Sequence, residues 1–244
     1  MSTLFLALGL SVVGGLGGLL VAASVLLIND SARTRVVPWL VSYAVGALLG
    51  AATLKILPEA AEQVAPARLF ATLLAGVMLF FVLEKLVLWR HCHTHDCEVH
   101  ESSVASVMIG DTFHNFVDGA VIGAAVLTSI PLGVSTAIAV AAHEIPQEIG
   151  DFAILLHAGY SRERALLLNV LSALASVAGA MGTFLAFDLV PRTLPYFLVI
   201  AASSFLYVAM ADLIPGLHRG RTDASSLRQI VLIALGIFTM IWFS

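Results

Sequence analysis

Eight long apolar segments account for almost the whole of this 244-residue chain. A hydrophobic stretch of roughly 20 residues is long enough to cross a lipid bilayer as a helix. Segments of this kind lie at 3–28, 37–58, 69–89, 103–128, 131–157, 164–187, 194–215 and 227–243. Their apolar runs are continuous rather than alternating, which argues against an outer-membrane barrel. The sequence therefore predicts an all-α, polytopic membrane bundle of eight transmembrane helices that forms a single domain over residues 1–244.

The composition excludes several other classes of protein. Only 11% of the residues are charged, less than half of the roughly 25% found in soluble domains. There are 12 Lys and Arg against 16 Asp and Glu, without a basic patch, so nucleic acid is not an expected partner. No Lys or Arg precedes the first segment, and its apolar run is too long for a signal-peptide core. We therefore expect it to be retained as a span.

The positions of Lys and Arg indicate an orientation. If the N-terminus is outside, only Arg68 and Arg192 fall in outer loops. The inner loops then carry Arg33, Arg35, Lys85, Arg90, Arg162, Arg164, Arg219, Arg221 and Arg228. Short cytoplasmic loops are enriched in Lys and Arg, so both termini are predicted to lie outside. The compact chain, without an added outer domain, favours the bacterial inner membrane.

The predicted cytoplasmic loop at about 90–102 is dense in potential metal ligands. Within eleven residues it contains two cysteines, three carboxylates and four histidines, among them His91, His93 and His95. A disulfide between Cys92 and Cys97 is disfavoured in a reducing compartment. The spacing matches no closed zinc-finger pattern. The loop is interpreted either as a loose metal-capturing or sensing segment, or as a polar loop that happens to be rich in histidine.

The fourth segment carries ionisable side chains on one helical face. His114 follows Asp111 by three residues, and Asp118 follows His114 by four and Asp111 by seven. Asn115 lies beside this stripe. Side chains at these spacings share one side of an α-helix. Ionisable residues at membrane depth are costly and usually face the bundle interior, where they mark ion or proton pathways.

The fifth segment contains a second polar run, which reads His-Glu-Ile-Pro-Gln-Glu-Ile-Gly-Asp over residues 143–151. His143 and Gln147 are four residues apart; the acidic residues Glu144, Glu148 and Asp151 follow the same helical spacing. Pro146 removes one backbone hydrogen bond and is expected to kink and break the helix. If the two segments face each other, they combine imidazoles with carboxylates, which suit Zn²⁺ or another first-row divalent ion.

Two interpretations without a transported metal stay open for parts of this pattern. Buried polar side chains can join membrane helices by hydrogen bonds alone, and this applies individually to Glu148, Asp151 and His157. The run that starts at His143 also resembles HExxH, in which two histidines on one helical face bind zinc. Gln147 replaces the second histidine and Pro146 lies inside the motif, so a metalloprotease is not predicted.

These two motifs make the sequence similar to the ZIP family of divalent-metal transporters. His114-Asn115-x-x-Asp118 matches the HNxxD motif of the fourth span, and residues 143–151 match the HExPHExGD motif of one large subfamily. The resemblance covers essentially the whole chain. It implies a ZIP-like fold of eight spans, both termini outside, a His-rich loop between the third and fourth spans, and a homodimer.

By this resemblance, the two spans form a two-metal transport site midway through the membrane. The first metal position would be lined by His114, Asp118, His143 and Gln147. The second would be lined by Asn115, Asp118 and Glu144, with Asp118 bridging. Asn169 in the sixth span is the candidate for a further ligand of the second position. Asp111 and Glu148 would lie nearby as relay or outer groups.

Two positions depart from the family pattern. Gln147 stands where the motif has His, which removes an ionisable ligand and is expected to weaken or retune the first position. Relatives of the subfamily often carry His where Lys55 and Glu59 stand. A protonated Lys cannot bind metal. The hypothesis is that Lys55 acts as a fixed cation paired with a motif carboxylate; the alternative is that its side chain extends to the outer surface.

Small residues recur at helical spacing in two segments. The first segment contains Gly14-Gly15-x-Gly17-Gly18, and the sixth contains Ser172, Ala173, Ser176 and Gly179. Such stripes let helices approach closely. We expect packing within one chain, with a dimer seam as the alternative.

The predicted function is movement of a divalent transition metal, most readily zinc, into the cytoplasm between the fourth and fifth spans. Iron, manganese and cadmium are not separated from zinc by ligand type alone. No enzymatic activity is predicted. The alternatives are an intramembrane zinc-dependent hydrolase, with Glu144 activating a zinc-bound water, and a metal sensor acting through the loop. Expected partners are divalent metal ions, the lipid bilayer and a second copy of the chain.

Overall fold

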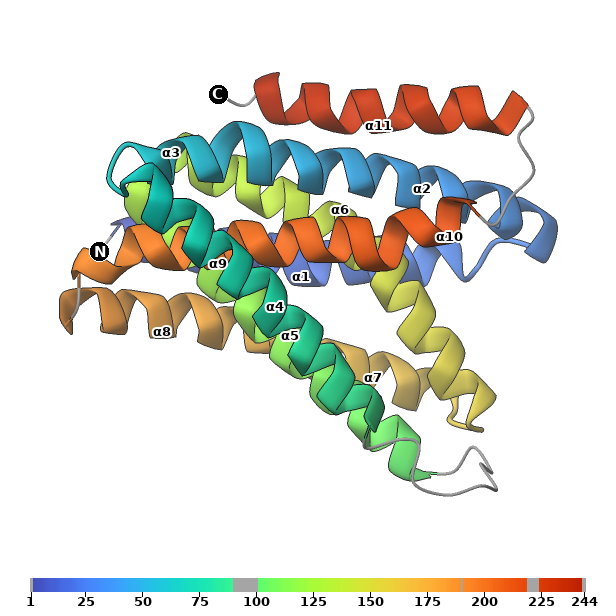
Figure 1. Ribbon diagram of the computed structural model, residues 1–244. Helices are drawn as coiled ribbons and strands as arrows, with labels where there is room; N and C mark the ends of the chain where they lie inside the picture. Colours follow the sequence, from blue (N-terminus) through green and yellow to red (C-terminus); the bar gives the residue numbers. More distant parts are fainter. Residues whose placement is uncertain (1, 90–100, 190, 219–223, 243–244) are drawn as a thin grey trace.

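A computed structural model of the chain describes residues 2–89, 101–189, 191–218 and 224–242 (Figure 1). The described residues form helices and no strand. With η marking short π- and 3₁₀-helices, the elements are α1 (Ser2–Val25), α2 (Asp30–Ala51), η1 (Ala52–Ile56), α3 (Leu57–Ala61), α4 (Pro66–Trp89), α5 (Glu101–Thr128), α6 (Ile130–His157), α7 (Arg162–Ala173), α8 (Ala175–Leu189), η2 (Pro191–Thr193), α9 (Leu194–Tyr207), η3 (Val208–Leu213), α10 (Ile214–His218) and α11 (Ala224–Trp242). The loop histidines His91, His93 and His95 lie outside the described residues.

Each predicted span coincides with one helical passage, so the predicted all-α membrane bundle is confirmed. Single helices form five passages, and α2–η1–α3, α7–α8 and α9–η3–α10 form the other three. The segments that are long and apolar enough to cross a membrane are Thr3–Val25, Thr34–Ala61, Pro66–Leu83, Arg162–Ala186 and Leu194–Leu217. Ser226–Trp242 is a shorter apolar helix. The helices with the polar motifs, α5 and α6, are not in this apolar set, because ligand-type residues interrupt their hydrophobic runs.

Local chemistry explains where several helices begin. Asn29 precedes α2, and its side-chain oxygen accepts a hydrogen bond from the amide of Ala32 at 2.9 Å. Ser129 and Ser161 cap α6 and α7 in the same way. These bonds satisfy amides that have no partner in the first turn of a helix. Gly159, with φ of 87°, then allows the tight turn between α6 and α7.

Two passages contain a π-helical turn just before a proline. η1 precedes Pro58 in the second passage, and η3 precedes Pro215 in the seventh. Proline cannot donate a hydrogen bond to the carbonyl one turn earlier. The wider winding of a π-helix accommodates that interruption without ending the passage.

The expectation that Pro146 breaks the fifth span is wrong. α6 continues as an α-helix from Ile130 to His157, with Pro146 inside it. A proline removes one backbone hydrogen bond, while the turns on both sides keep theirs. Neighbouring membrane helices then hold the helix together. As a result, the ligand-type residues on both sides of Pro146 stay on one continuous helix.

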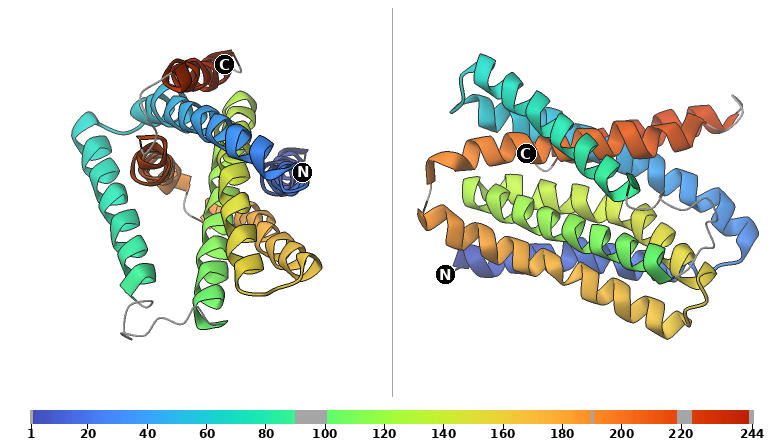
Figure 2. Two further views of the ribbon diagram at one scale, coloured as in Figure 1. Left: turned by 90° about the vertical axis from the view of Figure 1, so that its right-hand side faces the viewer. Right: turned by 60° about the horizontal axis from the view of Figure 1, so that its bottom comes forward.

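The helices fall into two groups by their contacts. The first helix group contains α1, α5, α6 and α7–α8, and the second contains α2, α4, α9 and α11 with their short extensions. In Figure 1, α11 lies along α2 on the side opposite α8; the left view of Figure 2 shows α4 standing apart from α5. The groups meet where α2 contacts α6 and where α5 contacts α9. The start of α1 and the end of α11 lie at the same end of the bundle (Figure 1).

Small residues let helices approach closely within each group. A β-carbon at Gly179 of α8 would overlap the backbone oxygen of Phe116 in α5, and one at Gly236 of α11 would overlap that of Tyr43 in α2. At Gly15 of α1, a β-carbon would lie 3.2 Å from the Ser176 hydroxyl. The small-residue stripes therefore serve packing within the chain, as predicted.

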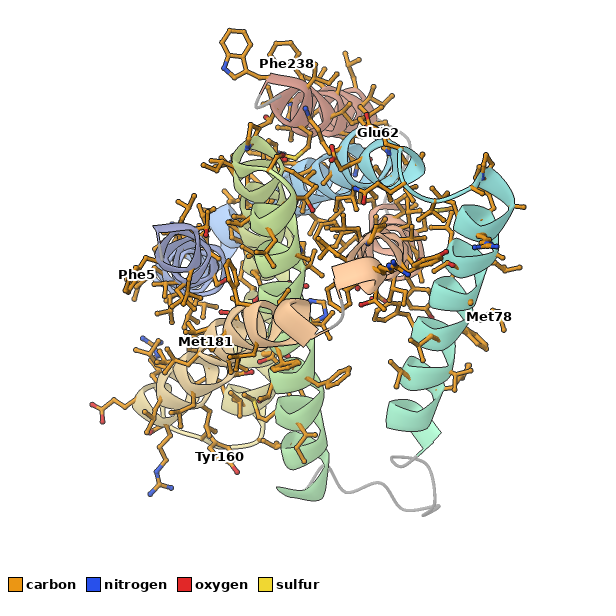
Figure 3. All side chains as sticks on the ribbon, turned by 90° about the vertical axis from the view of Figure 1, so that its left-hand side faces the viewer. Phe5, Glu62, Met78, Tyr160, Met181 and Phe238 are labelled. Carbon is orange, nitrogen blue, oxygen red and sulfur yellow. The ribbon has the colours of Figure 1, made fainter. Side chains whose placement is uncertain are left out.

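Large apolar side chains cover the outer surface. Phe5, Met78 and Phe238 point away from the molecule in Figure 3, and they are 68%, 51% and 54% exposed. Only 11% of the apolar window in α4 is buried inside the molecule. Such a surface is suited to lipid rather than water.

Candidate metal centre

Helix α5 contributes two facing groups, His114 and Asp118. They are one helical turn apart, with His114 Nε2 at 3.6 Å from Asp118 Oδ2. Asp118 is 1% exposed, whereas the side chain of His114 is 20% exposed. The imidazole therefore lies at the more accessible side of the pair.

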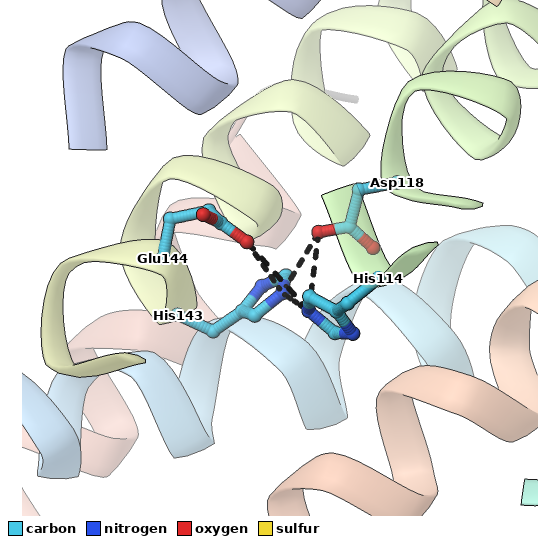
Figure 4. A group of neighbouring side chains, drawn as sticks. All are labelled: His114, Asp118, His143 and Glu144. Carbon is cyan, nitrogen blue, oxygen red and sulfur yellow. Dashed lines mark hydrogen bonds and ion pairs between the residues drawn. The ribbon is translucent and has the colours of Figure 1, made fainter. Parts of the chain in front are cut away.

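Helix α6 contributes His143 and Glu144, which are 1% and 0% exposed. His143 Nε2 is 2.9 Å from Asp118 Oδ2 and 3.1 Å from His114 Nε2. Oε1 of Glu144 is 3.6 Å from the His114 nitrogen and 3.7 Å from the His143 nitrogen. Figure 4 shows the four side chains converging from the two helices. We refer to His114, Asp118, His143 and Glu144 as the histidine centre.

A backbone contact fixes the orientation of His143. Its Nδ1 lies 3.0 Å from the carbonyl oxygen of Ala139. A carbonyl oxygen only accepts hydrogen bonds, so Nδ1 carries the hydrogen in this contact. In the neutral ring, the lone pair of Nε2 then faces the histidine centre. This arrangement is typical of histidines that bind metal.

The spacing of the four groups fits one small cation. Their ligand atoms all lie within 4.8 Å of one another, and the five separations that involve a histidine nitrogen run from 2.9 to 3.7 Å. Four ligands at about 2.0 Å from a tetrahedral zinc ion would be about 3.3 Å apart. Both oxygens of Asp118 and of Glu144 are buried without a hydrogen-bond partner. Burying charged oxygens in this way is costly unless a cation neutralises them.

Other predicted site residues lie around this centre. Asn115 is 1% exposed and its amide donates to Asp111 Oδ1 at 3.1 Å. Gln147, predicted to line the first metal position, donates to the same oxygen at 3.3 Å. Glu148 and Asn169 are each 0% exposed, and neither has a hydrogen-bonded side-chain oxygen. The structure thus brings His114, Asp118, His143 and Glu144 together and directs Gln147 toward Asp111.

Two residues next to the histidine centre were not singled out from the sequence as part of a site. A β-carbon at Gly18 of α1 would lie 2.7 Å from the β-carbon of Glu144, so this glycine lets α1 pack directly behind that ligand. Phe205 of α9 is 1% exposed, and its ring centre is 5.8 Å from that of His143. The stripe of glycines in the first segment was a sequence signal for Gly18. No sequence pattern indicated Phe205.

Lys55 lies in η1, in the second helix group. The carboxylates of Asp118 and Glu144 lie within 4 Å of the imidazoles of His114 and His143. The hypothesis that Lys55 pairs with a motif carboxylate stays a prediction.

Comparison with known proteins identifies what the chain is similar to. The sequence model of the ZIP zinc transporter family matches residues 89–244. The zinc transporter ZIP13 of Pongo abelii is 33% identical over 222 residues, which cover 84% of this chain and 66% of that protein. Human zinc transporter ZIP4 is 44% identical over 115 residues, which cover 47% of this chain and 18% of that protein. The chain therefore spans less than two thirds of the length of these relatives.

A third relative extends the same result. Zinc transporter ZIP10 of Danio rerio is 41% identical over 133 residues, which cover 52% of this chain and 16% of that protein. These names describe transporters rather than enzymes and give the hydrolase alternative no support. All three relatives are animal proteins, so they do not support the prediction of a bacterial membrane either.

Proposed function

Because the chain belongs to the ZIP zinc transporter family, we propose that it moves Zn²⁺ across a membrane by way of the histidine centre. The observation that carries this proposal is the convergence of two imidazoles and two carboxylates. Their ligand atoms all lie within 4.8 Å of one another on two adjacent helices. Mixed nitrogen and oxygen ligands bind zinc.

The burial pattern supports a transported ion rather than a permanently held one. Asp118, His143 and Glu144 are closed off from solvent, while His114 keeps 20% of its side chain accessible. A conducting site must bind an ion well enough to admit it and weakly enough to release it. An opening at one ligand gives the ion a side by which to enter or leave.

The proposed direction is into the cytoplasm, with both chain ends outside. The Lys and Arg distribution supports it, because nine of these residues lie in or next to the connections between spans that this orientation places inside. Zinc would pass from the histidine centre toward the cytoplasmic end of the bundle, where residues 90–102 would lie. A single transporter domain over residues 1–244 and a homodimer belong to the same proposal. Cross-linking in native membranes would test the dimer.

The transport proposal is tested by zinc influx into liposomes that hold the purified protein and a zinc-sensitive dye. The native protein should admit zinc, and Asp118→Ala should abolish the influx, since Asp118 contacts both histidines. Glu163→Gln, at an exposed carboxylate in the first turn of α7, is the matched control and should conduct normally. Equal influx in the native protein and Asp118→Ala would contradict the proposed path.

Two extensions of this assay address which metals are transported and whether the protein is a transporter or a metal sensor. Repeating it with Fe²⁺, Mn²⁺ and Cd²⁺ defines the range of substrates. Deleting residues 91–100 separates a transporter from a sensor that acts through the loop. A transporter should keep zinc influx after the deletion, whereas loss of influx would assign the loop an essential role.

A further inference from the structure

One aromatic side chain of the second helix group reaches the histidine centre. Phe205 of α9 is 1% exposed. In the described part of the chain, it is the one aromatic residue among the buried members of the apolar core that joins the two groups. Many of the other buried members are alanines, which come from α2, α5, α6 and α9. Because alanine side chains cannot extend, removal of the Phe205 ring would leave a cavity in this core.

The Phe205 ring lies against the imidazole of His143. The two ring centres are 5.8 Å apart and their planes are inclined at 60°, within the range of about 4.5–7 Å over which aromatic side chains contact each other. His143 also meets the ring of His114 edge-on, with 5.3 Å between the ring centres. The imidazole of His143 is therefore contacted by a ring from α5 and by a ring from α9.

The contact with Phe205 restrains a motion that the hydrogen bond within α6 leaves open. The bond between His143 Nδ1 and the carbonyl oxygen of Ala139, at 3.0 Å, fixes the direction of one ring nitrogen. It does not fix the tilt of the ring plane, because the last torsion of a histidine side chain has broad minima. An apolar ring restrains that tilt by contact alone. It also offers no polar atom that would compete with a metal ion for Nε2.

The position of this imidazole matters because metal ligands tolerate little displacement. Ligand side chains need to be held within about 0.5 Å and 10–20° of their productive geometry by the packing around them. His143 Nε2 lies 2.9 Å from Asp118 Oδ2, a separation that a small turn of the ring would change. Without the Phe205 ring, the imidazole would be free to turn into the vacated space.

We propose that Phe205 is a positioning residue for the histidine centre, which holds the His143 imidazole in its metal-binding orientation from the second helix group. This inference rests on the proposed function, since it takes His143 as a ligand of the transported zinc. The four side chains of the histidine centre come from α5 and α6. The second helix group thus contributes an apolar ring that orients a ligand, and zinc affinity depends on how α9 packs against the first group.

The experiment is a double-mutant cycle on the zinc affinity of the purified full-length protein in detergent, measured by competition with a chelator. Phe205→Ala should weaken zinc binding roughly tenfold, the lower end of the range seen when a partner of a metal ligand is lost. In a His143→Ala background the same change should alter affinity by less than about twofold, because the imidazole on which Phe205 acts is gone. Equal losses in the two backgrounds would overturn the proposal, and so would unchanged affinity in Phe205→Ala alone.

Phe197 provides a matched control on the same helix. It precedes Phe205 by eight residues in α9 and packs, partly buried, against the same core. Phe197→Ala removes an equally large ring and should leave zinc affinity within about twofold in both backgrounds. A loss as large as that in Phe205→Ala would assign the effect to the stability of α9 and overturn the proposal. If Phe205→Ala does not fold, Phe205→Leu replaces it in the cycle and should show a smaller loss with the same dependence on His143.

The two proposals can fail separately in these measurements. If the positioning role is wrong and transport is right, His143→Ala weakens zinc binding and zinc influx, while Phe205→Ala binds zinc as the native protein does. If transport is wrong and the positioning role is right, the effect of Phe205→Ala on zinc affinity depends on His143 as predicted, while no zinc enters liposomes.

Discussion

The two helix groups bury different kinds of polar side chain. Among the residues whose burial is described, the first helix group holds every buried carboxylate, imidazole and amide, whereas the second holds only buried serines. In the second group, Ser42 donates to the carbonyl oxygen of Pro38 at 2.6 Å, and Ser203 donates to that of Val199 at 2.8 Å. These hydroxyls are satisfied by their own helices. In the first group, oxygens of Asp118, Glu144 and Glu148 have no hydrogen-bond partner.

This difference separates hydroxyls that the chain itself satisfies from carboxylates that it leaves without a hydrogen-bond partner. Polar groups in membrane interiors are tolerated when they are satisfied internally. The serines of the second group meet that condition without help, because a helix carbonyl is always within reach of a serine in the next turn. Oxygens of Asp118, Glu144 and Glu148 in the first group lack such a partner within the chain, and in the proposed function a bound cation would satisfy those of the histidine centre.

The largest effect is expected from a pair of matched carboxylate changes, one in each group. Glu144→Gln removes the charge of a ligand that is 0% exposed and keeps its shape. Zinc affinity should fall by more than about 100-fold, since losing even an outer partner of a metal ligand costs 10–100-fold. Glu62→Gln, at an exposed position of the second group, should leave affinity unchanged in a chelator-competition titration. Equal losses of zinc affinity in the two variants would contradict the proposed difference between the two helix groups.

A smaller effect is expected from glycine changes in α1. Gly18→Val would force a side chain against Glu144, because even a β-carbon at residue 18 would lie only 2.7 Å from the β-carbon of Glu144. Displacing the ligand should lower zinc affinity roughly 10–100-fold. Gly17→Val is the control, because the nearest atom to its β-carbon is 3.9 Å away, in Val13. The same titration measures the zinc affinity of both variants. An equal loss of affinity in Gly17→Val and Gly18→Val would contradict the claim that close packing at Gly18 positions Glu144.

Gln147→His should raise the zinc affinity of the first helix group. Gln147 donates to Asp111 Oδ1 and lies four residues after His143 on a continuous helix. An imidazole there is a better zinc ligand than an amide, so zinc affinity should rise by about tenfold, the lower end of the range for groups around a bound metal. A calorimetric titration would measure the change. Unchanged or weaker zinc binding would place residue 147 outside the reach of the histidine centre.

The smallest effect is expected from Lys55→Ala in the second group. If Lys55 serves as a fixed cation near the motif carboxylates, removing it should raise zinc affinity by about two- to fivefold, as expected for a partly exposed charge. Zinc stoichiometry and affinity from equilibrium dialysis provide the readout. Identical values for the native protein and the variant would show that Lys55 does not act on the metal sites.

The sequence was sufficient to predict the number and positions of the helical passages, because apolar length dominates membrane structure. It also predicted that Asp118 and His114 share one face of α5, since helical periodicity alone fixes that relation. Periodicity within one helix carries no information about neighbours, however. The packing of Gly18 behind Glu144, and of Phe205 against His143, depends on how α1 and α9 dock, and their sequences do not encode that separately.

Two details of the motifs themselves were also beyond the sequence. Pro146 was expected to break α6, but the helix continues through it from Ile130 to His157. The hydrogen bond from the Gln147 amide to Asp111 joins two helices and could not be inferred from α6 alone, while the place of Gln147 in the first metal position stays a prediction. Sequence patterns within one helix predict which conformations and hydrogen bonds a residue can adopt. Contacts with neighbouring helices determine which of them it adopts.

The most direct test of the central claim is anomalous diffraction at the zinc absorption edge from crystals of the zinc-loaded protein. The account predicts an anomalous peak between α5 and α6, about 2.0–2.2 Å from the ligand atoms of His114, Asp118, His143 and Glu144. A principal peak within the second helix group, with no ion near these four side chains, would contradict it.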